Sequence, residues 1–276
     1  MNRPVPAPPA VEYPCSDGQP MAETEFQLIP LINAISALRS HFAGREDVYV
    51  VGNMFLYYQE GNPRAVVAPD LFVVVGAPKH KRHTYKLWEE PKAPDFVLEV
   101  TSRSTRKVDQ GRKREVYASL DVGEYWQFDP TGDYLAPRLQ GLQLHRGDYR
   151  PLPSVATVDG GLLLHSPTLG LDVRLERGEE LRFHDPATCQ DLLSYEETLT
   201  QMREARTQTR EAQAQTREAQ AQKSEAQAQK SEAQAQKSEA QARMREVQAR
   251  MREERAAHQA TRARLEELEA RLRRSG

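Results

Sequence analysis

The sequence predicts an α/β (α+β) fold, in which a mixed sheet is flanked by helices and is followed by a long C-terminal α-helix. Two observations predict this fold. β-branched and aromatic segments alternate with amphipathic ones before residue 200, and the remaining chain is a heptad repeat with Gly276 as its only Gly or Pro. Strands, one crossover helix and further strands are typical of a mixed sheet. We expect a Pro-rich disordered leader over residues 1–20, a globular domain over 21–190 and a long helix over 191–274.

The first elements are a helix and two strands. A helix is predicted over Glu23–Phe42, with a break or kink at Pro30 because proline lacks the N–H that the helix needs. The β-branched and aromatic segments Asp47–Tyr58 and Ala65–Val75 are predicted strands. Pro69-Asp70 lies inside the second strand, which therefore needs an edge or a bulge there. The apolar stripe of the helix consists of Phe26, Ile29, Leu31, Ile32, Ile35 and Leu38.

The following segments complete the predicted globular domain. Lys79–Trp88 is a basic loop, and Asp95–Val100 is a short buried strand. Asp109 is a favourable N-cap and is expected to open a helix over Asp109–Leu120. A strand is predicted over Val122–Asp129. Turns are predicted at Asp129–Gly132, Arg146–Asp148 and Arg177–Gly178, with hairpins through Arg182.

The C-terminal segment repeats every seven residues. Seven consecutive heptads run from Thr209 to Ala257 and consist of strong helix formers. With Met202 at position a, Lys faces Ala in the middle of the seam. A seven-residue period favours a left-handed coiled coil, and hence a homo-oligomer. The alternative is a solvated single helix held by Glu–Lys and Glu–Arg pairs, each giving about 0.2–0.5 kcal/mol. The seam is apolar near its C-terminal end, at Val247, Met251, Leu265, Leu268 and Leu272.

Composition and charge exclude several classes of protein. The 276 residues carry 38 Lys+Arg and 40 Asp+Glu, and this formal net charge of −2 argues against a protein that coats nucleic acid through bulk positive charge. The small value is a cancellation, because residues 1–200 hold 21 basic and 28 acidic residues, whereas residues 201–276 hold 17 and 12. Two cysteines give no disulfide framework, and no apolar run is long enough to span a membrane. We therefore expect a soluble, cytoplasmic protein with no membrane partner.

Two acidic residues stand at strand positions that usually hold Val or Leu. Asp70 lies in VVAPDLFVVV, and Glu99 lies in DFVLEVTS. A buried carboxylate is costly unless it is paired or binds a cation. Two carboxylates that meet across a sheet would supply the hard oxygen ligands that Mg²⁺ prefers. The alternative is that each carboxylate accepts a backbone N–H or pairs with an arginine at a sheet edge.

Basic residues flank these two positions along the chain, where they would serve an anionic substrate such as nucleic acid. The residues that follow Glu99 are Arg103, Arg106, Lys107, Arg112, Lys113 and Arg114. Those on the loop between the two strands are Lys79, Lys81, Arg82 and Lys86.

Four linked motifs resemble one known family. Pro69-Asp70, VLEVTSRST (Val97–Thr105), the DxxxKxxxY pattern of Asp109–Tyr117 and VGEYWQFDP (Val122–Pro130) occur in the order of the Uma-two family of restriction endonucleases. That family belongs to the PD-(D/E)XK nuclease superfamily. The resemblance covers roughly residues 20–190. It implies a restriction-endonuclease-like core and an endonuclease that hydrolyses phosphodiester bonds of nucleic acid, DNA above all, with Mg²⁺ or Mn²⁺.

The resemblance also implies roles for particular residues. Asp70 and Glu99 would be metal ligands, with the carbonyl of Val100 as a further ligand. The superfamily lysine should lie two residues after Glu99, where this chain has Thr101. The family pattern places that lysine at Lys113, on the following helix. The alternative for Lys113 is a solvated residue paired with the acid one helical turn earlier.

Three further residues have predicted roles near the site. Tyr117 is expected to pack rather than to take part in the chemistry. Glu23 and Glu25, on the first helix, could add a carboxylate to the metal site.

Three functions follow as hypotheses. The first is a Mg²⁺- or Mn²⁺-dependent endonuclease whose C-terminal coiled coil pairs catalytic domains. The second is a catalytically silent scaffold or interaction protein that acts through the coiled coil, and the third is a nucleic-acid-binding module without cleavage. The joint presence of Asp70, Glu99 and Lys113 favours the first, because a decayed nuclease would have lost one of them.

Overall fold

The computed structural model describes residues 11–16, 18, 24–103, 105–158, 160–176 and 180–274. The chain divides into two compact units, Met1–Gln201 and Met202–Gly276. Most of the predicted leader, Glu23 and the predicted turn Arg177–Gly178 lie outside the described residues. None of the helices in the described part of the chain is long and apolar enough to cross a membrane.

A six-stranded mixed sheet forms the centre of the first unit, in the order β1-β4-β6-β7-β8-β9. β6 and β7 are parallel, whereas the other neighbouring strands pair antiparallel. A parallel pair needs a crossover connection, and a helical segment supplies it here. The predicted mixed sheet is confirmed. Its strands are β1 (Val48–Gly52), β4 (Leu71–Val75), β6 (Phe96–Val100), β7 (Glu124–Phe128), β8 (Leu139–His145) and β9 (Asp148–Pro151).

Two smaller sheets accompany the central one. A five-stranded antiparallel sheet has the order β10-β11-β12-β13-β14, and a three-stranded sheet has the order β3-β2-β5. The first comprises β10 (Ser154–Ala156), β11 (Leu162–Ser166), β12 (Leu171–Leu175), β13 (Leu181–Asp185) and β14 (Gln190–Asp191). The second comprises β2 (Leu56–Tyr57), β3 (Val66–Val67) and β5 (Tyr85–Lys86).

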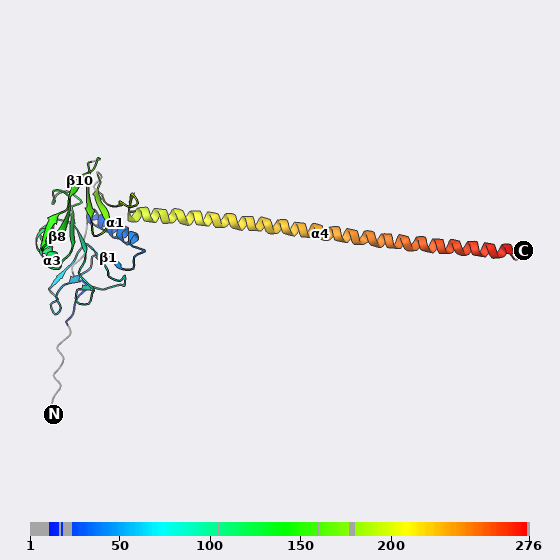
Figure 1. Cartoon of the computed structure of the whole chain (residues 1–276), viewed down its shortest axis with the longest axis horizontal. Coiled ribbons are helices and arrows are strands. Elements are labelled where there is room, and N and C mark those ends of the chain that lie inside the picture. Colours follow the sequence, from blue (N-terminus) through cyan, green and yellow to red (C-terminus); the bar gives the residue numbers. More distant parts are fainter. Residues whose placement is uncertain are drawn as a thin grey trace, which may run out of the picture. The chain divides into compact units, whose positions relative to one another are not determined.

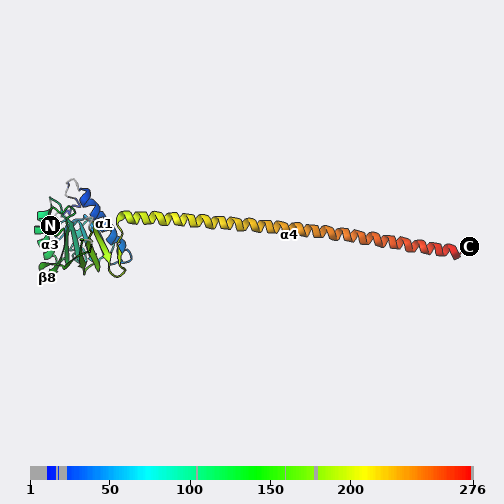
Figure 2. The ribbon, with the colours of Figure 1, turned by 90° about the horizontal axis from the view of Figure 1, so that it is seen from above.

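Apolar side chains cover both faces of the central sheet, because successive strand residues point to opposite faces. Val73, Leu98 and Trp126 belong to one core cluster, together with α1 (Glu25–His41) and the five-stranded sheet. Val97 and Tyr125 belong to the other cluster, together with the helical crossover and the three-stranded sheet. In Figure 2 α1 and the crossover helix α3 lie on opposite sides of the strands. The prediction of a sheet flanked by helices is confirmed.

Helix α1 differs from its prediction in two ways. Pro30 lies inside the helix and does not end it. The helix buries Leu31, Ala34 and Leu38 against the sheet, while Phe26 and Ile29 are exposed. The expected apolar stripe was therefore wrong for Phe26 and Ile29. The helix packs on the neighbouring face instead, where the small side chain of Ala34 lets it approach the sheet closely. The helix begins after Thr24, whose backbone N–H donates to Oε1 of Gln27 at 3.3 Å, as in a capping box.

Both long predicted strands are interrupted. Asn53 has φ 50°, and this left-handed residue separates β1 from β2. Asn adopts that conformation more readily than most residues, so it marks a turn that the β-branched pattern concealed. Pro69-Asp70 separates β3 from β4, which lie in different sheets, where the sequence predicted an edge or a bulge within one strand.

The crossover helix starts earlier than predicted. It consists of α2 (Arg106–Val108), a π-helical turn (Asp109–Lys113) and α3 (Arg114–Ser119). Asp109 is therefore not the N-cap, and its side chain is 1% exposed. The predicted N-cap role was wrong, because the buried Asp109 carboxylate pairs with Lys113 and does not cap the helix.

Helix α4 runs from Tyr195 to Arg274 without interruption (Figure 1). A capping box starts it: the Ser194 N–H donates to Oε2 of Glu197 at 2.7 Å, and the Glu197 N–H donates to Oγ of Ser194 at 3.2 Å. The predicted long C-terminal helix is confirmed. Its pairing into a coiled coil stays a prediction.

Candidate active site

Asp70 and Glu99 meet at one end of the central sheet. In the antiparallel register of β4 and β6, Leu71 pairs with Leu98, so the preceding and following residues, Asp70 and Glu99, are opposite each other. Residues opposite in an antiparallel pair share a face and have Cβ atoms about 4.5–5.5 Å apart. The Val100 N–H donates to Oδ2 of Asp70 at 2.7 Å, which ties the two strand ends together. The alternative considered from the sequence, that Asp70 accepts a hydrogen bond from a backbone N–H, is therefore found as well.

Glu99 is fully buried and both of its oxygens have partners. Lys113 Nζ lies 2.7 Å from Oε2, and the Tyr117 hydroxyl donates to Oε1 at 2.7 Å. Lys113 Nζ is also 3.1 Å from Oδ1 of Asp109. The lysine side chain is only 13% exposed, so the alternative of a solvated lysine is wrong although its pairing with Asp109 exists. Tyr117 is buried as expected, but it also binds the candidate ligand Glu99.

The crossover helix delivers these groups because of its spacing and its π-helical turn. Asp109, Lys113 and Tyr117 recur every four residues and so lie along one face of a helix. The π-helical turn spans Asp109–Lys113, and such turns occur frequently at functional sites. The Tyr125 hydroxyl donates to the backbone carbonyl of Asp109 at 2.8 Å and anchors the turn to β7.

Buried polar atoms without a hydrogen bond collect around Glu99. Within the described residues five buried side-chain atoms lack such a bond, and four of them are Oγ1 of Thr101, Oδ1 and Oδ2 of Asp109, and Nε2 of Gln127. Gln127 pairs with Glu99 in the parallel register of β6 and β7, and Thr101 is two residues beyond Glu99 on the same strand face. Native interiors contain few unsatisfied polar atoms, so these atoms are available to bond a water molecule or a ligand.

Charge and burial shift the pKa values of the two central groups. Burial raises the pKa of Glu99 above its usual range, the Lys113 ammonium opposes this shift, and the neighbouring Asp70 and Asp109 add to it. Burial by itself lowers the pKa of Lys113, but attraction to Glu99, Asp109 and Asp70 outweighs it, so that pKa is raised. Lys113 is therefore a permanent cation among three carboxyl groups.

The model of the family described as "Uma2: Putative restriction endonuclease" matches residues 3–176. This chain belongs to the Uma2 family. The comparison with curated proteins gave no match. Among solved structures, a crystal structure described as a putative nuclease belonging to DUF820 from Anabaena variabilis aligns with a TM-score of 0.40 and 12% identity, over 56% of this chain and 80% of that chain. Membership of the Uma2 family makes nucleic acid the implied class of substrate.

The basic residues predicted to face the substrate of this Uma2 protein divide into two groups. Arg103, Arg106, Lys107, Arg112 and Arg114 are all exposed on or before the crossover helix. The Arg114 guanidinium also donates to the carbonyl of Tyr149 at 3.0 Å, so it is partly used by the fold.

The basic loop is used largely by the fold itself. The side chain of Arg82 is 3% exposed and forms a 2.6 Å ion pair with Glu90, so the expectation that it serves the substrate was wrong. Lys79 Nζ donates to the carbonyls of Phe42 and Ala43, at 2.6 and 3.0 Å. Glu25 is exposed in the first turn of α1 and contributes nothing to the acidic cluster that the structure displays.

Sequence reasoning missed Asp109, Gln127 and Thr101 as residues that lie beside Glu99 in the candidate site. Asp109 had a local explanation as a helix cap, and Gln127 and Thr101 are ordinary strand residues by composition. A signal did exist for Gln127, because an amide in the middle of the apolar strand EYWQF is as unusual as the glutamate of FVLEV.

Proposed function

We propose that this protein is a divalent-metal-dependent endonuclease of the PD-(D/E)XK type that hydrolyses phosphodiester bonds in DNA. Family membership supports a nuclease. The observation that carries the proposal is the convergence of Asp70, Glu99 and Lys113 at one sheet end, among buried polar atoms without hydrogen bonds. The lysine then acts from the crossover helix and not from the strand position held by Thr101.

The donor atoms fit a hard cation such as Mg²⁺ or Mn²⁺. Among the described residues no three His, Cys, Asp or Glu side chains converge closely enough to hold an ion by themselves. Asp70, Glu99 and the Val100 carbonyl would therefore hold it together with water, as Mg²⁺ usually keeps several waters. The buried carboxylate of Asp109, which Lys113 pairs at one oxygen, adds to the excess of acidic groups that a divalent cation would balance. When bound, such an ion makes a coordinated water more acidic and stabilises charge on a phosphate.

The other residues of the site would orient the metal ligand Glu99 and neutralise negative charge on the phosphate. Lys113 is held by Glu99 and Asp109, and its ammonium would stabilise the negative charge that develops on the scissile phosphate. Tyr117 fixes one oxygen of Glu99 and thereby sets the direction of the other. Gln127 Nε2 and Thr101 Oγ1 carry hydrogen-bond donors that a water or a phosphate oxygen would satisfy.

The test is cleavage of a supercoiled plasmid and of a single-stranded oligonucleotide by the full chain with Mg²⁺, with Mn²⁺ and with a chelator. We expect cleavage that needs the ion and that Asp70→Ala and Glu99→Ala abolish. The matched control is Glu124→Gln, which changes another buried glutamate on the opposite sheet face. Equal residual activity in all variants would indicate a contaminating nuclease and contradict the proposal.

We also propose that α4 pairs copies of the chain, so that two catalytic sites act on one nucleic-acid molecule. Apolar side chains stand exposed along the heptad seam in the single chain, at Met202, Met244, Val247, Met251, Leu265 and Leu268. Three exposed i,i+4 ion pairs, of which Arg243 with Glu239 is one, support the single-helix alternative only weakly, since each gives about 0.2–0.5 kcal/mol.

Light scattering of the full chain tests the pairing. The variant Val247→Glu/Leu268→Glu places charges in the seam and should reduce the oligomeric mass. The control Ala249→Glu/Ala270→Glu adds the same charges away from the seam and should leave the mass unchanged. A monomeric wild-type chain would contradict the pairing. Pairing without any cleavage would instead favour the scaffold function.

A further inference from the structure

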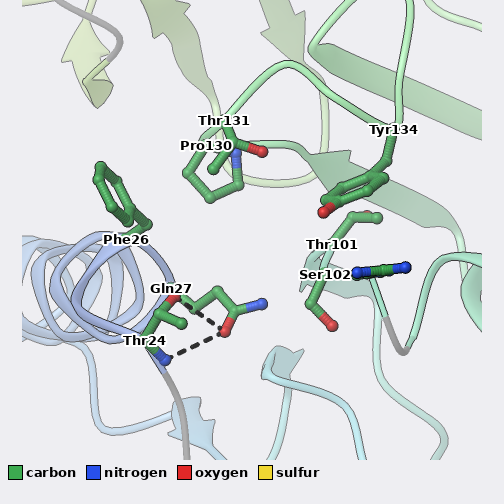
Figure 3. Close-up of a pocket in the computed structure, with 9 residues that line it drawn as sticks. Thr24, Phe26, Gln27, Thr101, Ser102, Pro130, Thr131 and Tyr134 are labelled. Atoms are coloured by element: carbon green, nitrogen blue, oxygen red, sulfur yellow. Dashed lines mark hydrogen bonds between the residues drawn. The ribbon is translucent and has the colours of Figure 1, made fainter.

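A pocket opens beyond the C-terminal ends of the parallel strands β6 and β7 (Figure 3). Its volume of about 600 Å³ lies within the roughly 300–1,000 Å³ typical of small-molecule sites. Thr101, Ser102 and Arg103 reach it from the end of β6, and Tyr134 reaches it from the loop after β7. Phe26 completes it from the first turn of α1.

The walls combine flat apolar surfaces with neutral hydrogen-bonding groups and cations. Phe26 is 65% exposed and Tyr134 is half-buried, and both side chains line the pocket. The Arg106 guanidinium lies 5.5 Å from the centroid of the Tyr134 ring. Aromatic faces beside guanidinium groups are the usual platform for bases of single-stranded nucleic acid.

The polar groups of the pocket include one that is buried and unpartnered. Thr101 is 1% exposed, and its Oγ1 lacks a hydrogen bond within the described residues. Figure 3 shows the amide nitrogen of Gln27 directed toward the side of the pocket where Ser102 lies, while Oε1 is engaged by Thr24. These groups can both donate to and accept from the edge of a nucleobase.

The loop that carries Tyr134 is held in place before any ligand arrives. Asp129 Oδ2 accepts the backbone N–H groups of Tyr134 and Leu135 at 2.6 and 2.9 Å, and its Oδ1 accepts those of Thr131 and Gly132 at 3.1 and 2.9 Å. These bonds keep the pKa of Asp129 below its usual range although burial opposes them. A fixed aromatic wall loses little freedom on binding, which favours affinity.

The pocket adjoins the acidic cluster and shares Thr101 with the unsatisfied polar atoms around Glu99. Thr101 is two residues beyond Glu99, and Asp70 lies at the same end of the sheet, where it accepts the Val100 N–H. A nucleic-acid strand with a phosphate at the cluster would have its neighbouring nucleotide at this end of the sheet, where the pocket opens.

We propose that this pocket binds one unpaired nucleotide of the substrate next to the scissile phosphate, with its base against Tyr134 and Phe26. The inference rests on the proposed nuclease function and specifies its substrate class, namely nucleic acid with an unpaired base at the cleavage point. A base inside an intact duplex is stacked and cannot enter, so single strands, flaps and mismatched sites are preferred.

The experiment measures binding of the full chain in a chelator, where cleavage is suppressed, to oligonucleotides with 2-aminopurine at a single position. Fluorescence reports stacking of that base, and anisotropy reports affinity. We expect Tyr134→Ala and Phe26→Ala each to weaken single-strand binding by about tenfold to a hundredfold, in line with the loss of one stacked base. Tyr134→Phe keeps the ring and should stay within about threefold of the wild type. Phe26→Ala changes an exposed side chain and keeps the fold intact.

An abasic site at the same position of the oligonucleotide should weaken binding to the wild-type chain by the same factor. It should cause no further weakening in Tyr134→Ala. Equal weakening of single-strand and fully paired binding, or no effect of the abasic site, overturns the pocket assignment. The two proposals fail separately. If Tyr134→Ala leaves plasmid cleavage unchanged, only the pocket assignment is overturned. If binding depends on the base but no cleavage occurs in Mg²⁺ or Mn²⁺, only the nuclease function is overturned.

Discussion

Two buried glutamates on neighbouring parallel strands have opposite surroundings. Glu99 on β6 and Glu124 on β7 are both fully buried, but they point to opposite faces of the central sheet. Glu124 accepts hydrogen bonds from Nε1 of Trp126 at 2.8 Å, from Oγ of Ser166 at 2.6 Å and from the N–H of Thr168 at 2.6 Å. These are neutral donors from its own strand, from β11 of the five-stranded sheet and from the turn that follows β11.

Glu99 has a cation and other acids around it instead. Lys113 pairs with it, Asp70 and Asp109 raise its pKa further, and Gln127 lies beside it with an amide nitrogen that lacks a hydrogen bond within the described chain. A carboxylate with a complete set of neutral donors joins two sheets. One in an acidic, incompletely bonded cluster is suited to binding a further charged group. Burial alone therefore does not distinguish a structural acid from a functional one.

The largest expected difference between the two glutamates is in cleavage. Glu99→Gln should lower the cleavage rate by on the order of 10³-fold, because it removes a candidate metal ligand. Its fold should persist, since Lys113 keeps Asp109 as a partner. Glu124→Gln should cleave within about threefold of the wild type, as expected for a group that does not touch the reacting atoms. Plasmid nicking rates compare the two, and equal losses would remove the distinction between them.

Lys113→Met should produce the largest change in stability. It leaves Glu99 and Asp109 buried without their cation, and breaking a buried pair in this way costs about 3–5 kcal/mol. Both tryptophans, Trp88 and Trp126, lie in the first unit, so urea unfolding followed by tryptophan fluorescence reports on it. The double variant Lys113→Met/Glu99→Gln should recover most of the loss. An unchanged unfolding free energy in the single variant would show that the pair is not buried in solution.

Glu124→Gln should lower the unfolding free energy by about 1–3 kcal/mol, because one carboxylate oxygen becomes an NH2 group that faces a donor which the oxygen had bonded. Ser166→Ala removes only one of these partners, and its smaller loss of about 1 kcal/mol serves as the comparison. The same fluorescence-detected unfolding measures both variants. If Glu124→Gln unfolds at the wild-type urea concentration, the proposed joining of the two sheets is contradicted.

A paired acid near the surface should show the smallest effect. Hydrogen bonds from Arg182 and from the Ser194 N–H lower the pKa of Glu197 from 4.5 to about 2. A lowered pKa stabilises the fold above the unfolded value of 4.5, and this contribution is lost as the pH falls toward 2.

Glu197→Gln should therefore cost less than about 1 kcal/mol at pH 7, and the deficit should shrink at pH 3.5. Glu196→Gln removes the same charge from the same helical turn and serves as the control. A deficit that does not depend on pH would point to packing instead of charge.

Much of the site was predictable because its residues violate the strand pattern. Asp70 and Glu99 are conspicuous among Val and Leu, and Lys113 follows from the family motif. Arg82 was predicted to serve the substrate but forms a buried ion pair with Glu90, because sequence distance does not show which basic side chains the fold itself uses. The exposure of Phe26 was missed for a similar reason, since α1 has two overlapping apolar stripes and only the packed sheet selects one.

The sequence by itself determined the existence of a mixed sheet, an irregular strand at Pro69-Asp70 and the long helix α4, because these depend on local propensity and periodicity. Only the tertiary structure decided that Asp109 is a buried member of the acidic cluster and not a helix cap, and that Glu99 and Glu124 differ. Each of these depends on which groups the register and the crossover helix bring within hydrogen-bond distance. That distance is a property of strands and helices far apart in the chain.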